Sequence, residues 1–350
     1  MPKVTVYDVA ELAGVSIATV SFAFTRPGKV KAETLQNVMA AADQLGYVPS
    51  GSARGLARGR TGALGIYSYD YLLDPEHDKP ATDAGAPDPD GRLFPLYADE
   101  VQRGVQIECR RRGYALMLGG NRASDHLPHV IEVAGRVDGL IVFAGALTRS
   151  ELRQVTARIP VVELGGTERD SARTVLVDNE SGMFDLALHL IEQHRYRRFA
   201  YVGELGTEEF RARRRGFERA LGAHGIATPE VTPAHAGVDA STLRAVSTIL
   251  ALPEPPEVIV CDTDQSALAA IVALRTAGLR VPDDVAVTGF DGILAGRITA
   301  PVLTTVRQPM EQIGRVAVEI LSSALDEQDD ARPAPVLTCT LFVGSSCGKH

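Results

Sequence analysis

Five side chains near the N-terminus have the types and spacing of a surface that binds nucleic-acid bases. They occupy positions i, i+1, i+4, i+5 and i+8, which share one face of an α-helix: Ile17, Ala18, Ser21, Phe22 and Thr25. Apolar groups of this kind can contact a thymine methyl, and hydroxyl groups can bind bases or phosphates. The pattern is typical of a helix that enters the major groove of DNA.

Two short helices joined by a tight turn would position this face. Val6 and Val9 recur at helical spacing, and Gly14 follows where a left-handed residue would end the first helix. Ser16 is a favourable N-cap for the second helix. That helix would turn three apolar side chains into a core: Val20, Ala23 and Phe24. Ordinary helical hairpins show the same short pattern, so it does not establish DNA binding by itself.

A third amphipathic helix is predicted over residues 33–45, ending before Gly46. Its inward positions would be Leu35, Val38, Met39, Ala42 and Leu45. The segment Tyr47-Val48-Pro49 follows, and then a stretch over 50–61 that is rich in Ser, Gly, Ala and Arg. With these residues added, nearly the whole chain resembles the LacI/GalR family of bacterial transcriptional regulators, most specifically over its first sixty residues.

The resemblance implies an α/β protein with an N-terminal three-helix helix-turn-helix head and a two-lobed sensor domain with parallel sheets, like periplasmic binding proteins. The expected boundaries are 1–49 for the head, 50–61 for a hinge segment and 62–350 for the sensor, which would bind an effector and dimerise. Family members bind DNA as dimers. We therefore expect a homodimer or larger on a pseudo-palindromic double-stranded operator, with the helix over 308–325 in the subunit contact.

The resemblance assigns DNA contacts in the head. Phosphate contacts would come from Thr5, Tyr7, Ser16, Thr19, Ser21, Thr34 and Tyr47. The base-reading positions hold Ile17, Ala18 and Phe22, where many relatives carry Arg instead of Phe22. None of these three side chains can make a bidentate hydrogen bond to a base, so they are expected to make apolar contacts. A core position for Phe22 is the alternative, although Val20, Ala23 and Phe24 already fill the inward face.

The hinge segment would form a short helix with Ala53, Leu56 and Ala57 on one face. Glycines at 51 and 55 make such a helix marginal alone, so we expect it to fold on binding DNA. In the family a leucine at the position of Leu56 wedges into the minor groove and kinks the duplex. A plain flexible linker is the alternative.

Charge is unevenly distributed along the chain. The net charge is −8, yet the residues up to Gly62 hold seven Lys and Arg against four Asp and Glu, a balance of +3 that leaves −11 for the rest. A basic head on an acidic body is expected of a DNA-binding module joined to a sensor. No apolar run precedes the first helix or reaches membrane-spanning length, so we expect a cytoplasmic protein without a membrane partner.

Short apolar runs alternate with amphipathic segments from Ala63 onwards, which predicts parallel sheets covered on both faces. Strands are expected over 64–67, 115–118, 140–143, 161–164, 199–202, 258–261 and 285–288, and helices over 96–112, 149–158, 208–224, 240–252 and 264–277. The two sets indicate two lobes, with a ligand where their strand ends face each other. Residues 71–93, rich in Pro, Gly and Asp, read as an exposed loop or, less simply, as a lid.

Effector-binding candidates come from the resemblance. They are Arg213, Asp291, Thr263, Asp264 and Asp178. A guanidinium and a carboxylate can each bond two adjacent hydroxyls, which suits a sugar or sugar-derived ligand. Thr263 stands where relatives often have Asn. For Arg213 a surface charge among Arg211, Arg214 and Arg215 is the alternative, and for Asp178 a helix cap.

No catalytic motif of the G-x-S-x-G, G-x-x-x-x-G-K-[ST] or H-E-x-x-H type occurs, so we expect no enzyme. The four cysteines have no C-x-x-C spacing and are expected to be thiols in a reducing compartment, with no metal and no cofactor. The sequence thus predicts a sequence-specific regulator, expected to be a repressor, with a small-molecule effector. Control by a protein partner or a phosphorylated metabolite and, more distantly, a sugar-binding receptor are the alternatives.

Overall fold

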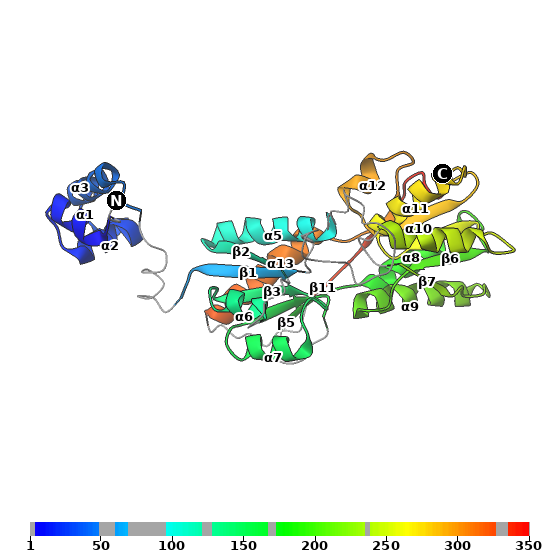
Figure 1. Ribbon diagram of the computed structural model, residues 1–350, viewed down its shortest axis with the longest axis horizontal. Helices are drawn as coiled ribbons and strands as arrows, with labels where there is room; N and C mark the ends of the chain where they lie inside the picture. Colours follow the sequence, from blue (N-terminus) through cyan, green and yellow to red (C-terminus); the bar gives the residue numbers. More distant parts are fainter. Residues whose placement is uncertain are drawn as a thin grey trace. The chain divides into compact units, whose positions relative to one another are not determined.

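The computed structural model describes residues 4–48, 60–68, 96–120, 128–166, 173–234, 239–326 and 335–349. The chain divides into two compact units, Met1–Gly62 and Ala63–His350, each with its own core (Figure 1). The hinge candidates Ala53, Leu56 and Ala57 and the insertion over 71–93 lie outside the described residues.

The first unit holds the three predicted helices, α1 (Val6–Ala13), α2 (Ile17–Thr25) and α3 (Ala32–Leu45), with a 3-10 turn over Pro27–Lys29. Gly14 and Gly46 both adopt a φ of +64°, so each ends a helix in the left-handed conformation that glycine tolerates best. Val9, Val20 and Val38 are fully buried at the centre of the core.

The inward stripe of α3 differs from the prediction at two positions, Met39 and Ala41. Met39 was expected in the core, but 46% of it is exposed. The buried residues are Val38, Ala41 and Ala42, which follow the i, i+3, i+4 spacing of one helix face. The small alanines let α3 approach its neighbours closely, and Met39 falls beside that stripe.

The first lobe of the second unit is a six-stranded sheet of order β11-β5-β4-β3-β1-β2. All of its strand pairs are parallel. The strands are β1 (Ala63–Ser68), β2 (Ala115–Gly120), β3 (Gly139–Phe143), β4 (Val161–Leu164), β5 (Arg173–Val177) and β11 (Val336–Leu337). Helices α5 (Leu96–Arg112) and α13 (Met310–Leu325) cover one face, and α6 (His129–Ala134) and α7 (Arg149–Thr156) cover the other.

The second lobe repeats this plan with the order β12-β10-β9-β8-β6-β7, in which only β12 is antiparallel to its neighbour. The strands are β6 (Phe199–Gly203), β7 (Val231–Pro233), β8 (Val258–Cys261), β9 (Ala286–Asp291), β10 (Thr304–Arg307) and β12 (Thr340–Phe342). Its helices are α8 (Asn179–Glu192), α9 (Glu208–Ala223), α10 (Asp239–Leu250), α11 (Asp264–Thr276) and α12 (Leu294–Ile298). Helices α8 and α9 pack on one face of the sheet, α10 and α11 on the other.

The two lobes are not continuous segments of sequence. The chain passes from the first lobe to the second after β5, returns at α13, and enters the second lobe again between β11 and β12. Helix α13 packs closely against α5. A Cβ on Gly104 of α5 would lie 2.0 Å from the Glu311 carbonyl oxygen of α13, so glycine is needed at this contact. The apolar face of α13 is therefore buried in its own lobe, and its exposed residues are polar: Glu311, Gln312, Glu319 and Ser323.

Among the described residues no single helix is long and apolar enough to span a bilayer. Taken together, α1 and α2 would pass on length and composition, but they are bent by 102°.

Candidate DNA-binding face and effector site

The predicted reading face of α2 is exposed in the structure. Ser16 caps the helix, since its Oγ accepts the N–H of Thr19 at 3.1 Å. Ile17 is 40% and Phe22 43% exposed, and Ala18 and Ser21 are exposed as well. The core alternative for Phe22 is therefore wrong. Phe24 takes the inward position and lies with its ring 5.9 Å from that of Tyr47.

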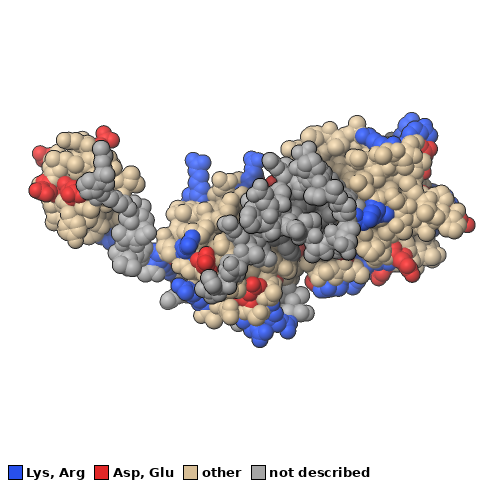
Figure 2. Space-filling model, viewed as in Figure 1, with Lys and Arg blue, Asp and Glu red and all other residues tan. Residues whose placement is uncertain are grey.

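Thr5, one of the polar candidates of the head, is engaged with a neighbouring carboxylate. The Thr5 hydroxyl and its N–H each donate to Asp8 at 2.7 Å, and these bonds lower the pKa of Asp8. Tyr7 is 67% exposed, whereas Thr34 and Tyr47 are half-buried. The face of the head seen in Figure 2 carries several Asp and Glu side chains, which repel a phosphate backbone.

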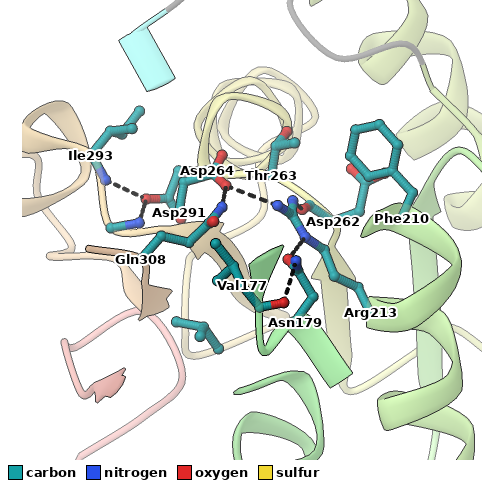
Figure 3. A network of polar contacts seen from close by, with 12 residues as sticks. Val177, Asn179, Phe210, Arg213, Asp262, Thr263, Asp264, Asp291, Ile293 and Gln308 are labelled. Atoms are coloured by element: carbon teal, nitrogen blue, oxygen red, sulfur yellow. Dashed lines mark hydrogen bonds and ion pairs between the residues drawn. The ribbon is translucent and has the colours of Figure 1, made fainter. Parts of the chain in front are cut away.

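Arg213 is the centre of a polar network in the second lobe (Figure 3). Its Nε donates to Asn179 Oδ1 at 2.8 Å, and its Nη1 donates to the backbone carbonyl of Asp262. Its Nη2 lies 3.3 Å from Asp291 Oδ1. The guanidinium also stacks on Phe290, with Cζ 4.0 Å from the ring centroid.

Burial separates Arg213 from Arg211 and Arg215, whereas Arg214 is also buried, at 8% exposed, and pairs with Glu218. Only 4% of Arg213 is exposed, while the side chains of Arg211 and Arg215 are about half exposed and pair with surface glutamates. The alternative of a surface charge is therefore wrong for Arg213. A buried guanidinium with a carboxylate partner leaves a charge pair that a ligand can share or replace.

Asp291 ends β9 in an unusual backbone conformation, with a φ of +120°. Non-glycine residues rarely adopt such values, and they persist where the surroundings hold them. Gln308 supplies part of that hold, because its Nε2 donates to Asp291 Oδ1 at 2.7 Å. The carboxylate is thereby fixed at the strand end, facing Arg213.

Asp264 supports the turn that follows Asp291. It is fully buried, and one of its oxygens accepts the N–H groups of Gly292 and Ile293 at 2.7 and 2.8 Å. Its other oxygen accepts the Thr305 hydroxyl. Burial raises the pKa of Asp264 well above its ordinary value. Its oxygens are thus engaged by the protein itself.

Thr263 and Asp178 both occupy helix caps. The Thr263 hydroxyl accepts the N–H of Ser266 at 3.2 Å at the start of α11. Asp178 Oδ1 accepts the N–H of Ser181 at 3.0 Å at the start of α8. The predicted set is therefore brought to one end of the second sheet, with Arg213 and Asp291 in direct contact. Asp264, Thr263 and Asp178 hold the surrounding elements, and their contact with ligand stays a prediction.

Gln308 and three other residues of the network were not predicted. Asn179 fixes the Arg213 fork and belongs to the same V-D-N triplet as Asp178, so the signal was one position away. Asp262 lies two residues before Asp264, and its carboxylate fills the space beside Gly203, where a Cβ would lie 2.3 Å from Asp262 Cγ. No motif in the sequence indicated that Glu209 belongs to this network.

The first lobe reaches this network. A Cβ on Gly165, just after β4, would lie 2.1 Å from Glu209 Cδ of α9, so these segments touch. The N–H of Leu294 donates to Glu100 Oε1 of α5 at 3.1 Å. Burial and the nearby carboxylates of Glu209 and Asp291 raise the pKa of Tyr97, also in α5, well above its ordinary value.

The carboxyl groups around Arg213 titrate close to neutrality. Burial raises the pKa of Glu209 and of Asp262 to about 7 and that of Asp291 to about 6, although Arg213 acts in the opposite direction on each. One guanidinium thus faces several carboxyl groups that can either donate or accept a hydrogen bond.

Two buried acceptors beside the network have no hydrogen-bond partner among the described residues. They are Asp262 Oδ1 and Gln308 Oε1. A buried polar atom without a partner is costly, at roughly 1–3 kcal/mol. Both would be satisfied by hydroxyl or amine donors of a small molecule.

Each of the two units matches a model of a known protein family. The model "Bacterial regulatory proteins, lacI family" matches residues 5–50, and the model "Periplasmic binding protein-like domain" matches residues 187–347. The HTH-type transcriptional repressor PurR of Aliivibrio fischeri (strain ATCC 700601 / ES114) is 32% identical over 338 residues, which cover 94% of each chain. PurR of Vibrio atlanticus (strain LGP32) is 31% identical over 335 residues, or 93% of each chain.

Solved structures agree in fold. The Lac repressor dimer bound to operator and the anti-inducer ONPF has a TM-score of 0.79 at 24% identity, covering 99% of this chain and 100% of that one. The transcriptional regulator CelR in complex with cellobiose has a TM-score of 0.67 at 28% identity, covering 98% and 100%. The head, the two parallel-dominated sheets and the full-length relatives agree, and the chain belongs to the LacI family of bacterial regulatory proteins as a DNA-binding transcriptional repressor.

Proposed function

We propose that this repressor is controlled by a small neutral polyhydroxy ligand, a sugar or sugar-derived molecule, bound between the lobes beside Arg213 and Asp291. The observation that carries this proposal is the pair of unpartnered buried acceptors, Asp262 Oδ1 and Gln308 Oε1, on either side of that ion pair. Acceptors need donors, and adjacent hydroxyls supply several at sugar spacing. The structural relative CelR was solved with cellobiose, which is a ligand of the same class.

Charge argues against a phosphorylated metabolite as the effector. Around Arg213 the described residues place the buried Asp262 and Asp291 and the half-buried Glu209, with pKa values of about 6 to 7. A phosphate would bring about two further negative charges into this set and meet one guanidinium already paired with Asp291. A neutral ligand avoids that repulsion. The relatives are repressors, so we propose that the ligand is bound and released unchanged.

Control of DNA binding then follows from unequal ligand affinity for different arrangements of the lobes. Glu209 against Gly165 and Glu100 against Leu294 are contacts between lobes that the ligand would strengthen or break. Only the difference in affinity between the two states can be transmitted, and about 1–3 kcal/mol suffices. We propose that the segment over 50–61, with Ala53, Leu56 and Ala57, carries the change to the head over 1–49 from the sensor over 62–350.

A ligand panel tests the effector class. The thermal unfolding midpoint of the full chain is measured with neutral mono- and disaccharides, polyols, their phosphates and free purine bases. We expect a neutral sugar to raise the midpoint and to change operator affinity, because a ligand that binds only the folded state stabilises it. A response restricted to phosphorylated compounds or bases would overturn the sugar assignment without affecting the family assignment.

The exposed Phe22 predicts how the operator is read. Phe22→Ala should lower discrimination at one base pair of each half-site, by roughly 1–3 kcal/mol, because an apolar contact with a base is lost. Affinity for random DNA and its salt dependence should hardly change, since phosphate contacts supply them. Selection from a randomised operator library measures both. An unchanged consensus would show that Phe22 is not a base contact, and Tyr7→Phe, which should weaken all sequences alike, is the control.

LacI-family repressors act as dimers, and we propose that the second lobe supplies the subunit contact. Three large apolar side chains on α11 and α12 are strongly exposed: Val272 at 58%, Leu294 at 55% and Ile298 at 77%. The two elements are tied together, because the Arg275 guanidinium of α11 donates to the carbonyl of Ala300 beyond α12. An exposed apolar group of this kind is typical of an interface, here with a second copy of the chain.

A further inference from the structure

Two histidines close together in sequence meet a cysteine that is remote from both, in the second lobe. His189 lies in the last turn of α8, His194 follows that helix, and Cys347 lies in the segment after β12. One potential ligand atom from each falls within 4.8 Å of the others. His189 stands ten residues along α8 from Asn179, so a rise of 1.5 Å per residue puts the cluster roughly 15 Å from the Arg213 network.

The distances fit tetrahedral coordination. Cys347 Sγ lies 3.8 Å from His189 Nε2 and 3.5 Å from His194 Nε2. Bond lengths of about 2.3 Å for Zn–S and about 2.0–2.1 Å for Zn–N, at tetrahedral angles, separate a sulfur from a nitrogen ligand by roughly 3.6 Å. The two observed separations lie on either side of this value.

The sulfur of Cys347 lies within hydrogen-bond distance of a threonine hydroxyl. Thr304 Oγ1 lies 3.0 Å from Cys347 Sγ and also accepts the N–H of Gly344 at 3.0 Å. With that lone pair engaged, the Thr304 hydroxyl can donate its proton to the sulfur. A metal ion would replace the thiol proton of Cys347, because metals bind cysteine as the thiolate.

The C-terminal segment is shaped around the ring of His194. Tyr196 stacks on that ring, with centroids 5.4 Å apart and planes within 13°, and its hydroxyl donates to the Cys347 carbonyl at 2.9 Å. Gly348 has a φ of +127°, and a Cβ there would lie 2.8 Å from His194 Nδ1. Glycine therefore allows the chain to pass the imidazole, and the ring orientation is fixed by its neighbours.

The burial of the three side chains fits a metal site with three protein ligands and one small ligand such as water. Cys347 is fully buried, whereas both histidines are half-buried. The sulfur is thus held in the interior and the imidazoles reach towards solvent. Sites with three protein ligands commonly keep a water in the fourth position.

We propose that His189, His194 and Cys347 form a zinc site that fastens the C-terminal segment to the end of α8. On binding, one Zn–S and two Zn–N bonds form, the thiol proton passes to solvent, and water completes the tetrahedron without any redox change. A cation of this type suits a mixed thiolate and imidazole set. The site departs from the expectation that the cysteines bind no metal, because its ligands are 153 residues apart for His194 and Cys347.

Metal titration of the untagged full chain, first stripped with a chelator, tests the site. We expect one equivalent of Zn²⁺ to bind per chain and to raise the thermal unfolding midpoint. Co²⁺ should give the visible bands of tetrahedral coordination with a thiolate-to-cobalt charge-transfer band. Cys347→Ser should abolish the charge-transfer band, and His194→Gln should weaken Zn²⁺ binding by roughly tenfold or more.

Matched controls separate the cluster from other thiols and imidazoles. Cys339→Ser and His224→Ala, in the same lobe but outside the cluster, should bind as the wild type does. The proposal fails if the wild type binds no stoichiometric Zn²⁺, in which case the cluster is only packed, or if Cys347→Ser binds unchanged. Should Cys347→Ser not fold, His194→Gln decides the matter, because its half-buried ring can be replaced with less disturbance.

Discussion

Arg213→Ala is expected to abolish the response to the effector and to destabilise the sensor by about 3–5 kcal/mol. The guanidinium is buried and bonded to Asn179, Asp262 and Asp291, so its loss removes a ligand contact and leaves Asp291 buried without its cation. The measurements are operator affinity with and without effector, and unfolding by urea.

The destabilisation should depend on pH in a defined direction. Burial already raises the pKa of Asp291 to about 6, and Arg213 opposes this, so its removal raises that pKa further. A carboxyl group whose pKa is higher in the folded than in the unfolded state stabilises the protein at low pH. That contribution is lost as pH rises through the folded-state pKa. The variant should therefore be closest to the wild type near pH 5 and fall further behind it towards pH 8.

Arg215→Ala is the matched control, because the half-exposed side chain of Arg215 pairs with Glu180 and Glu208 at the surface. It should cost less than about 1 kcal/mol and leave the response intact. If Arg213→Ala still responds fully, the effector binds elsewhere. If it cannot bind operator even without effector, Arg213 is required for the fold rather than for the ligand.

Ile298→Glu is expected to convert the dimer to monomer and to weaken operator binding by roughly 10²–10⁴-fold. The side chain is 77% exposed on α12 beside Leu294, and a carboxylate there would have to be buried in a dimer interface. Two linked heads gain affinity because the second binds at high effective concentration, and a monomer loses that gain.

Sedimentation at micromolar concentration and an operator titration check this result. Leu252→Glu, at an exposed apolar position after α10, is the control and should remain dimeric. A dimer that persists in Ile298→Glu would direct attention to the polar face of α13, as the sequence resemblance predicted. A monomeric variant with undiminished operator affinity would contradict the argument that two heads act together.

The elements of the sensor were largely predictable because buried parallel strands are short apolar runs. The predicted bounds of β8 and β4 are those observed, and α5 begins and ends where periodicity placed it. The packing of α13 in the first lobe could not be predicted, since no local feature of residues 310–325 indicates which sheet they cover. The prediction that Met39 is buried was wrong for a related reason, because the elements packed against a helix decide which of its residues are buried.

The binding site was predictable only in part. Arg213 and Asp291 came from a family resemblance, and the structure joins them at 3.3 Å. The partners of Arg213 lie 34 and 49 residues away, at Asn179 and Asp262, and periodicity carries no record of such pairings. The cluster of His189, His194 and Cys347 is a further case, because only the folded sheet brings the last residues of the chain to α8.

The repeated passage of the chain between the lobes bears on how the protein is made. Ile313, Val318 and Leu321 of α13 belong to the core that covers β1, β3 and β4, yet they follow every strand of the second lobe except β12. A ribosome delivers the N-terminal strands first. Until α13 emerges, the first lobe must therefore wait with α5 alone on this face of its sheet, and a chain truncated before α13 would leave the apolar surface under that helix exposed.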